Sequence, residues 1–463
     1  MSTPTRALGL FSVLCIGVNA IVGSGIYRLP GRLGHYLGPA SWLAFALVGL
    51  MLVAVALCFA EAAGMFSGTG GPYLYAREAF GTVPGFLVGW SAWVTMVLSF
   101  AAVANAVPGY LASLAPSLDG PKMPAVTIAT IALGLGIVNL LGVKPGALTT
   151  NVFTAAKVVP LAVFVALGLF AVSGDNLGLV PRPAVVPAQL GGAASAAAAP
   201  MPLAGALGAA LFAALFPCQG FEVAPVPAGE TKEPTRNVPI AVIGALLASV
   251  AFYVLIQIVA YGTAPSIATS GATPDKPWST RPIVEAAATF MGTGGARFMA
   301  AGACVSMVGF CAGSALVTPR FLVALGQDGL LPRALAHHGR RFESPHVAIV
   351  TTSVAVLVAA LALDFDALVD LSNVAVIAQY ALTCAAITWL RRTRPELPRR
   401  YRVPGGRWLV PLVGVGVCAL LASQAKVSEL AMSLVMMAAG GVFALAYRAF
   451  RPRATPVRTD LPS

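Results

Sequence analysis

Gly23, Ser24 and Gly25 interrupt an apolar stretch near the start of the chain, and such an interruption can bind charged groups. Glycine and serine are poor helix formers, and in lipid the backbone groups of a broken helix must be received by protein or by a polar cavity. The half-helix after the break would aim free N–H groups at an anion, and the half-helix before it would present carbonyls to a cation. The stretch therefore predicts a site for a zwitterion. The alternative is that these small residues only let two helices pack closely.

A second interruption lies in a later apolar run, where Pro217 is followed by Gly220 and then by Glu222. Proline removes a backbone donor and clashes with the preceding turn, so a second broken helix is expected here, with a carboxylate in its unwound part. If the apolar spans form two halves of five, each break falls in the first helix of a half. Paired interruptions at corresponding positions indicate the binding site of an inverted-repeat transporter.

Lys157 and Glu222 are ionisable residues inside apolar spans. An ammonium at that depth costs at least ~2.5 kcal/mol, so Lys157 needs either a partner or the loss of its proton. A lysine that gains and loses a proton predicts coupling to the proton gradient, and the alternative is a permanent charge that links spans one, five and eight. Glu222 is the second candidate for proton coupling; its alternative role is to accept hydrogen bonds from backbone donors that the break releases. Glu61, near the end of the second span, is expected to serve helix packing or to reach toward the membrane surface.

Composition defines the environment in which these residues act. Of 463 residues, 58% are hydrophobic and only 10% are charged, whereas soluble proteins carry about 25% charged residues. The chain is therefore predicted to be an all-α polytopic membrane protein. Because about 20 apolar residues cross a bilayer core, about twelve spans are expected, at residues 8–34 (broken), 40–66, 84–113, 124–141, 149–173, 201–228 (broken), 237–262, 296–326, 345–363, 368–390, 408–424 and 428–449.

Lysine and arginine gather in alternate loops, and this pattern gives the predicted orientation. Their enrichment marks the cytoplasmic side, which places both termini in the cytoplasm, and the membrane is expected to be a prokaryotic cytoplasmic (inner) membrane. The net charge of +12 follows this distribution, so membrane lipids rather than nucleic acid are the expected partners. Residues 174–200 are expected to form an external low-complexity linker, and residues 391–407 a solvated cytoplasmic loop.

The seven cysteines all lie in apolar segments and lack CxxC or Cys/His spacing. Such spacing is what disulfide frameworks and zinc sites require. No disulfide, metal site or cofactor is therefore predicted.

Several motifs occur along the chain in the order typical of one transporter family. They are Gly23–Ile26 in the first span, Gly68–Gly81 after the second, Gly220–Glu222 and Gly229–Pro239 in and after the sixth, and Gln327–Pro332 after the eighth. Over residues 8–390 the chain thereby resembles the amino acid–polyamine–organocation (APC) family of amino acid permeases. The resemblance implies a LeuT-like fold, with a first inverted repeat at 8–173, a second at 201–390, and two additional helices at 408–449.

The resemblance also implies how the two breaks bind an amino acid. The amides of Ser24 and Gly25, with Gly23 nearby, are expected to hold the substrate carboxylate. Carbonyl groups on both breaks are expected to receive the α-ammonium group, and they belong to Ile21, Val22, Phe216 and Gln219.

Side chains around the second break are expected to set the shape of the site. Phe216 stands where family members often carry a gating aromatic, so it is expected to close over the substrate, or alternatively to be a packed core residue. Cys218 and Gln219, next to Gly220, replace the apolar or aromatic residues that are commoner at that bend. Ser314 stands where some relatives have a large aromatic, so that wall of the site is expected to be roomier here.

The sequence thus predicts a secondary active transporter, not an enzyme, that moves amino acids by alternating access with a proton as the coupling ion. Two alternatives stay open: an amino acid exchanger without net proton coupling, and a porter of polyamines or other organic cations, which would need cavity carboxylates beyond Glu222. A membrane enzyme would need a polar catalytic cluster, which His35, His337, His338 and His346 do not supply. A channel would repeat a filter or rings of charge, unlike two dissimilar breaks.

Overall fold

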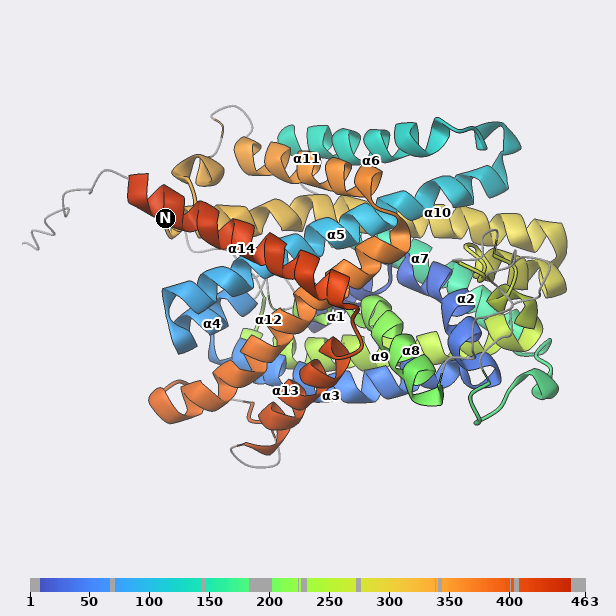
Figure 1. Cartoon of the computed structure of the whole chain (residues 1–463), viewed down its shortest axis with the longest axis horizontal. Coiled ribbons are helices and arrows are strands. Elements are labelled where there is room, and N and C mark those ends of the chain that lie inside the picture. Colours follow the sequence, from blue (N-terminus) through green and yellow to red (C-terminus); the bar gives the residue numbers. More distant parts are fainter. Residues whose placement is uncertain are drawn as a thin grey trace, which may run out of the picture.

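The computed structural model describes residues 9–66, 71–142, 147–182, 202–223, 225, 231–271, 276–337, 339, 344–399, 401–403 and 408–450. The secondary-structure elements within these ranges are all helices (Figure 1). Parts of two motifs (Gly68–Gly70 and Gly229–Glu230), residues 183–200 of the expected linker, and His338 lie outside the described residues.

The helices follow the predicted spans closely. They are α1 (Leu10–Ile21), α2 (Gly25–Leu37), α3 (Trp42–Met65), α4 (Pro72–Phe80), α5 (Thr82–Leu114), α6 (Met123–Leu140), α7 (Ala147–Gly168), α8 (Leu203–Cys218), α9 (Pro234–Thr263), α10 (Pro282–Gln327), α11 (His346–Ala362), α12 (Phe365–Thr393), α13 (Leu409–Ala422) and α14 (Val427–Phe450).

Within the described ranges, eight helices are long and apolar enough to cross a membrane, and the bent pair α1 and α2 makes a ninth. Two shorter apolar helices are α11 and α13, and residues 157–168 of α7 form a further apolar segment. The prediction of an all-helical, multi-pass membrane protein is confirmed. The number twelve stays a prediction, because α11 has 17 residues and α13 has 14, fewer than the roughly 20 that cross a bilayer core.

Two helices depart from the predicted pattern. α4 forms in what is expected to be a loop after the second span, and it packs against α5. α10 begins at Pro282 rather than near residue 296, because the helix continues across a kink at Gly292. Gly292 has a φ of 67°, which glycine adopts without the steric cost that a Cβ would bring.

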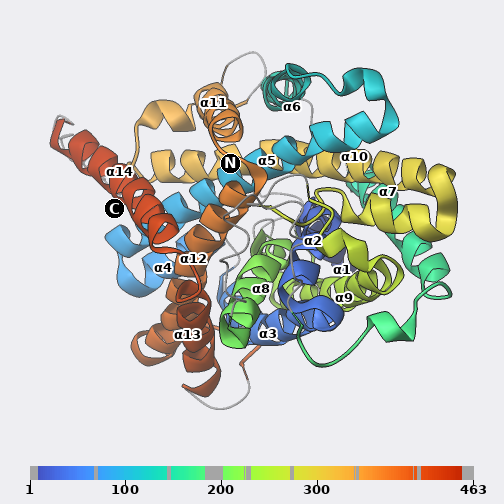
Figure 2. The same cartoon turned by 45° about the vertical axis from the view of Figure 1, so that its right-hand side comes forward.

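Small residues let the long helices approach closely. A Cβ at Gly49 of α3 would lie 2.3 Å from Val250 of α9, and a Cβ at Gly302 of α10 would lie 2.7 Å from Pro160 of α7. In lipid, where burying apolar surface gains little, such contacts supply van der Waals attraction between helices. α5 and α10 pack along each other in the bundle, and α13 and α14 lie against α12 (Figures 1 and 2).

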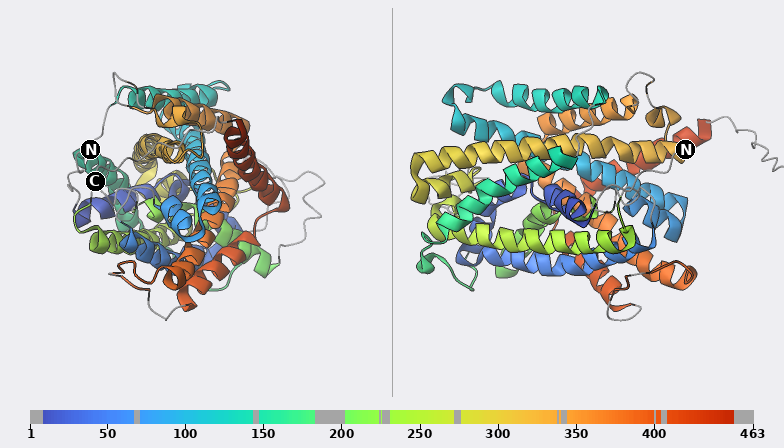
Figure 3. Two further views of the ribbon diagram at one scale, coloured as in Figure 1. Left: turned by 90° about the vertical axis from the view of Figure 1, so that its left-hand side faces the viewer. Right: turned by 180° about the vertical axis from the view of Figure 1, so that it is seen from behind.

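Both predicted breaks are present, and both lie inside the bundle (Figure 3). α1 ends at Ile21, Val22–Ser24 are not helical, and the chain then turns by 48° into α2. At the second break, Pro217 and Cys218 stay within α8, which corrects the prediction that unwinding begins at Pro217. A proline removes only its own N–H donor, so the last helical turn can contain it.

The helix ends instead where the backbone itself changes. Gln219 is extended, with φ −71° and ψ 156°, and Gly220 has a φ of 121°. The short 3₁₀ turn Phe221–Val223 follows. The break in α8 therefore begins two residues later than expected and is followed, among the described residues, by a turn.

Glu61 of α3 connects the C-terminal end of α12 to the bundle. Its side chain is fully buried, and its carboxylate accepts hydrogen bonds from Arg391 Nε (2.8 Å) and from the Val403 amide (2.8 Å), with Arg399 Nε 3.9 Å away. Arg391 and Arg399 expose only 11% and 4% of their side chains. This part of the arginine-rich loop is therefore packed rather than solvated, because a buried carboxylate requires cationic partners.

Replacing the Glu61 carboxylate with an amide should strongly destabilise the protein. Glu61→Gln leaves Arg391 and Arg399 without their buried counter-charge, and breaking such a pair costs roughly 3–5 kcal/mol. We expect a clear drop in the melting temperature of the detergent-solubilised protein, measured by tryptophan fluorescence. Glu78→Gln, at an exposed position on α4, is the matched control; equal melting temperatures for the two variants would contradict this role of Glu61.

Candidate functional site

The two helix breaks meet directly. A Cβ at Gly25, the first residue of α2, would lie 2.9 Å from the Pro217 Cβ, so α2 and α8 touch at that point. A Cβ at Gly220 would lie 2.6 Å from the carbonyl carbon of Ala20, so the second break also contacts the end of α1. No residue larger than glycine fits at either contact without a shift of the backbone.

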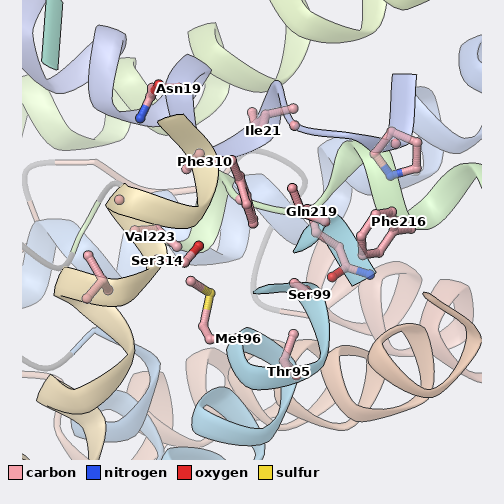
Figure 4. A pocket seen from close by; sticks show the side chains of 18 of the residues that line it. Asn19, Ile21, Thr95, Met96, Ser99, Phe216, Gln219, Val223, Phe310 and Ser314 are labelled. Atoms are coloured by element: carbon pink, nitrogen blue, oxygen red, sulfur yellow. The ribbon is translucent and has the colours of Figure 1, made fainter. Parts of the chain in front are cut away.

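A cavity of about 100 Å³ lies beside this contact (Figure 4). Most of the residues predicted to bind substrate line it, namely Ile21, Gly23, Ser24, Gly25, Phe216, Gln219, Gly220 and Ser314. Val22 and Cys218 do not line it; both are buried in the surrounding core. A second cavity of about 10 Å³ lies next to the first and shares Thr95, Met96, Glu222 and Val223 with it.

The cavity presents unpaired donors at the first break. Within the described part of the chain, the amides of Gly23, Ser24 and Gly25 make no hydrogen bond to another residue. The Ser24 hydroxyl is fully buried and also has no partner there. A helix N-terminus with free N–H groups is suited to an anion, so this end of the cavity is suited to a carboxylate.

Three of the four carbonyls predicted to receive an ammonium group already have one donor. Ile21 C=O accepts from the Tyr253 hydroxyl at 3.0 Å, and Val22 C=O accepts from Lys157 Nζ at 3.3 Å. Phe216 C=O accepts from the Gln219 amide at 3.2 Å. A carbonyl oxygen has two lone pairs, so each retains capacity for one further donor.

Lys157 is buried behind the first break. Its Nζ donates to Asn19 C=O at 3.2 Å and to Val22 C=O at 3.3 Å, and it lies 5.9 Å from the centre of the Phe310 ring. No carboxylate of the described residues pairs with it. Lys157 thus donates hydrogen bonds to carbonyls that α1 leaves free at its end. Phe310 lines the cavity, whereas Lys157 does not.

Glu222 lines the cavity and also stabilises the second break. Its Oε2 accepts from the Gly220 amide at 2.8 Å and from the Tyr380 hydroxyl at 2.7 Å. The hydrogen bond from Gly220 corresponds to the alternative role that the sequence predicts for Glu222, in which its carboxylate accepts from a backbone donor released by the break. Whether Glu222 also carries a proton during transport stays a prediction.

Several site residues could not be assigned from the sequence. Gln219 Nε2 donates to Asn373 Oδ1 at 2.6 Å, and Ser372 links the Gln219 carbonyl oxygen Oε1 to Ser99. The adjacent polar pair Ser372 and Asn373 inside an apolar span is the signal that could have indicated α12. Phe310 lies one turn before Ser314 on α10. A Cβ placed on Gly23 would lie 3.2 Å from the Phe310 ring, so an aromatic side chain does form a wall of the site.

Ion pairs and aromatic contacts lie beyond the end of the cavity that is predicted to face outward. Arg32 of α2 binds Asp370 of α12 through two hydrogen bonds of 3.1 Å, and it also contacts Asp366 at 3.4 Å. Lys276 contacts Asp366 at 3.4 Å. These contacts join the outer half of the first span to α12.

Nearer the cavity, the rings form a second layer. Phe216 contacts Phe365 edge-to-face at 6.2 Å, and the Arg28 guanidinium lies 4.3 Å from the centre of the Phe365 ring. The predicted gating residue thus belongs to the layer that covers the cavity.

Asp364 extends the ion pairs into the loop before α12, where Lys276 Nζ lies 2.9 Å from its carboxylate. Burial alone would raise the pKa of Asp364. Hydrogen bonds from the Ala367 amide and from Lys276 outweigh burial and hold that pKa below its ordinary value. The carboxylate therefore stays charged and available to Lys276 at neutral pH.

Among the described residues, no three or more His, Cys, Asp and Glu side chains are grouped so that they could hold a metal ion. The chemistry available at the cavity is therefore that of backbone dipoles, hydroxyls, amides, Glu222 and, behind the wall, Lys157.

Comparisons with known proteins agree with this geometry. A family model described as "Amino acid permease" matches residues 8–451. The chain is 28% identical to the Serine/threonine exchanger SteT of Bacillus subtilis, over 86% of this chain and 86% of the relative. It is 27% identical to the b(0,+)-type amino acid transporter 1 of Mus musculus (92% and 83%), and 25% identical to the Methylthioribose transporter of Bacillus subtilis (89% and 87%).

Gly25→Ala should strongly weaken substrate binding. The new methyl group would lie 2.9 Å from Pro217 and would force α2 away from α8, which displaces the amides that face the cavity. We expect uptake into proteoliposomes to fall at least roughly tenfold, as a misplacement of about 1 Å can do. Gly134→Ala, on α6 with nothing within 4 Å of its Cβ position, is the matched control. Wild-type uptake by Gly25→Ala would show that the close contact is dispensable.

Asp370→Asn should open the outer end of the cavity. It removes the charge that Arg32 binds, and charged hydrogen bonds contribute about 1.5–3 kcal/mol. In a protein whose seven native cysteines are replaced, Val103→Cys places a thiol at a residue that lines the cavity. We expect an impermeant thiol reagent to react with it roughly tenfold faster when Asp370→Asn is present. Asp175→Asn, on an exposed turn, is the control. Equal reaction rates with and without Asp370→Asn would show that Asp370 does not help to close the cavity.

Proposed function

The chain belongs to the amino acid permease family, and on that premise we propose that it is a secondary active transporter that carries an amino acid by alternating access together with a proton. The observation that carries this proposal is the contact between two broken helices beside a small cavity. Free N–H groups of residues 23–25 and the Ser24 hydroxyl are available there for a carboxylate. Gln219 and Asn19, which also line the cavity, offer acceptors for an ammonium group.

The arrangement of helices supports the inverted repeat proposed for residues 8–173 and 201–390. Helices at corresponding positions of the two halves pack against each other: α2 with α8, α3 with α9, α5 with α10, and α6 with α11. The cross-contacts also occur in pairs, since α1 packs on α9 as α3 packs on α8, and α5 packs on α12 as α10 packs on α7. A two-fold axis between two repeats would produce this set of contacts.

The same proposal includes twelve spans with both termini in the cytoplasm of a prokaryotic cell. In it, α7, α11 and α13 cross as spans five, nine and eleven, and α13 and α14 are the two additional helices at residues 408–449. The outer closure by Arg32 and Asp370 leaves the cavity to reach the cytoplasm past Glu222 and Val223, which lie beyond the second break.

Lys157 supports proton coupling over exchange without a coupled proton. Its Nζ holds the Asn19 and Val22 carbonyls, so its charge bears directly on the end of α1. Loss of the proton leaves two N–H donors but removes the charge that strengthens both hydrogen bonds, which loosens the break and links protonation to the position of α1. An exchanger is the second candidate, because the relative SteT is named as one; there, Lys157 would act as a permanent charge.

A polyamine porter is less well supported. It would need several carboxylates at the cavity, and among the described lining residues only Glu222 is acidic. One oxygen of that carboxylate already accepts two hydrogen bonds.

Substrate and coupling can be tested in one reconstituted system. Uptake of external radiolabelled amino acid into proteoliposomes is measured in the presence of unlabelled amino acids, putrescine or methylthioribose, with and without a pH gradient. Competition by amino acids is expected, and stronger competition by the amine or the thio-sugar than by any amino acid would overturn the assignment.

Two substitutions at Lys157 separate a titrating residue from a fixed charge. Lys157→Ala should abolish accumulation driven by a pH gradient while some substrate binding remains. Lys157→Arg keeps a charge that does not deprotonate in proteins, so it should also lose proton-driven accumulation but retain exchange of internal for external substrate. Lys232→Ala, at an exposed position, is the control. Proton-driven accumulation by either Lys157 variant at the wild-type level would defeat the coupling role.

A further inference from the structure

Thr95 of α5 has an unpaired hydroxyl in the wall of the substrate cavity. The residue is only 3% exposed, it lines the cavity, and its Oγ1 has no hydrogen-bond partner among the described residues. Leaving a buried hydroxyl unpaired costs about 1–3 kcal/mol. Such a group in a binding site is satisfied when the ligand supplies the partner.

The other helical threonines show that this is not the ordinary state of a threonine in this protein. Five of them donate to a carbonyl of the preceding turn, at distances of 2.7–3.0 Å: Thr263, Thr289, Thr318, Thr383 and Thr393. This local bond is the usual way for a threonine to pair its hydroxyl within a helix. Thr95 does not make it.

The unpaired atoms of the cavity lie on two opposite walls. Asn19 and Ser24 carry unpaired oxygens on the wall formed by the first break, where the charged ends of an amino acid would bind. Thr95 projects from α5 on the facing wall (Figure 4). An amino acid held by its carboxylate and ammonium groups at the break therefore directs its side chain toward α5.

Three other polar side chains near that wall are already paired. Ser99 shares a hydrogen bond of 2.9 Å with Ser372, and both ends of the Gln219 amide are bonded to α12. Glu222 accepts from Gly220 and Tyr380. Thr95, unlike Ser99, thus presents a hydroxyl on α5 that has no partner among the described residues.

The size of the cavity limits that substrate. A dry cavity of 150 Å³ accommodates benzene, whereas this one measures about 100 Å³. A small amino acid fits this volume, and a large aromatic or a long cationic side chain would require the walls to move.

We propose that Thr95 is a specificity-determining residue that selects small amino acids with a hydroxyl on the side chain, such as serine and threonine, over apolar analogues of the same size. The Thr95 hydroxyl and the substrate hydroxyl form one hydrogen bond, with either oxygen as donor. A site built to pair a substrate hydroxyl discriminates against the analogue without it, because the analogue leaves a protein group unpaired. This inference rests on the proposed transport function.

Matched substrate pairs test it. Affinity is measured by competition for two pairs, serine against alanine and threonine against valine. Because 1–3 kcal/mol corresponds to roughly 5–150-fold, the wild-type protein should bind the hydroxylated member at least about fivefold more tightly. Equal affinity within each pair would overturn the proposal, while a protein that accepts no amino acid at all would instead overturn the transport function.

Substitutions at Thr95 test whether this residue causes the preference for hydroxylated substrates. Thr95→Val and Thr95→Ala both remove the hydroxyl and should bring the ratio within each pair close to one, mainly by weakening serine and threonine. Thr95→Ser should keep the preference. Thr383→Val, which removes a buried threonine whose hydroxyl is locally paired on α12, is the matched control and should leave the ratio unchanged.

Melting curves establish which variants are folded, and the two hydroxyl-free variants provide independent tests if one is not. A hydroxyl preference that persists in Thr95→Val or Thr95→Ala would overturn the role of Thr95. Loss of the preference in Thr383→Val as well would overturn it too, because the effect would then not belong to the cavity wall.

Discussion

The carbonyl groups that α1 leaves free at its break are held by side chains from two other helices, and the site depends on those bonds. Tyr253 of α9 donates to Ile21, and Lys157 of α7 donates to Asn19 and Val22. On the other break, Glu222 receives the Gly220 amide. In lipid an unpaired backbone group costs several kcal/mol, so each interruption requires polar partners on neighbouring helices. The two breaks therefore depend on these buried polar residues.

This pairing leaves an imbalance that explains what the cavity is suited to bind. The carbonyls at the first break have donors, whereas the amides of residues 23–25 have no acceptor among the described residues. The cavity is thus richer in free donors than in free acceptors. It is prepared for a carboxylate first, and an ammonium group must use second lone pairs or Asn19 Oδ1.

The sequence predicts the parts of this site that involve unusual backbone chemistry. Gly23, Ser24, Gly25 and Gly220 are recognisable because glycine-rich breaks in apolar spans are rare, and Lys157 is recognisable because a charge at that depth is costly. The partners are not predictable in this way. Tyr253 and Phe310 look like ordinary span residues until the fold brings them to the break, and the burial of Arg391 against Glu61 depends on a contact across the chain. The end of α8 also lies two residues later than predicted, because the last turn of a helix can contain a proline such as Pro217.

α13 has a consequence for the lipid around the protein. Its 14 residues rise only about 21 Å as a helix, against a hydrocarbon thickness of about 30 Å. Leu409, Leu412 and Leu420 face outward along it and expose more than half of their side-chain surface. In the proposed twelve-span arrangement, acyl chains beside a helix this short compress to avoid leaving polar ends in hydrocarbon. The protein should therefore thin its own annulus of lipid at α13 and prefer membranes built from shorter acyl chains.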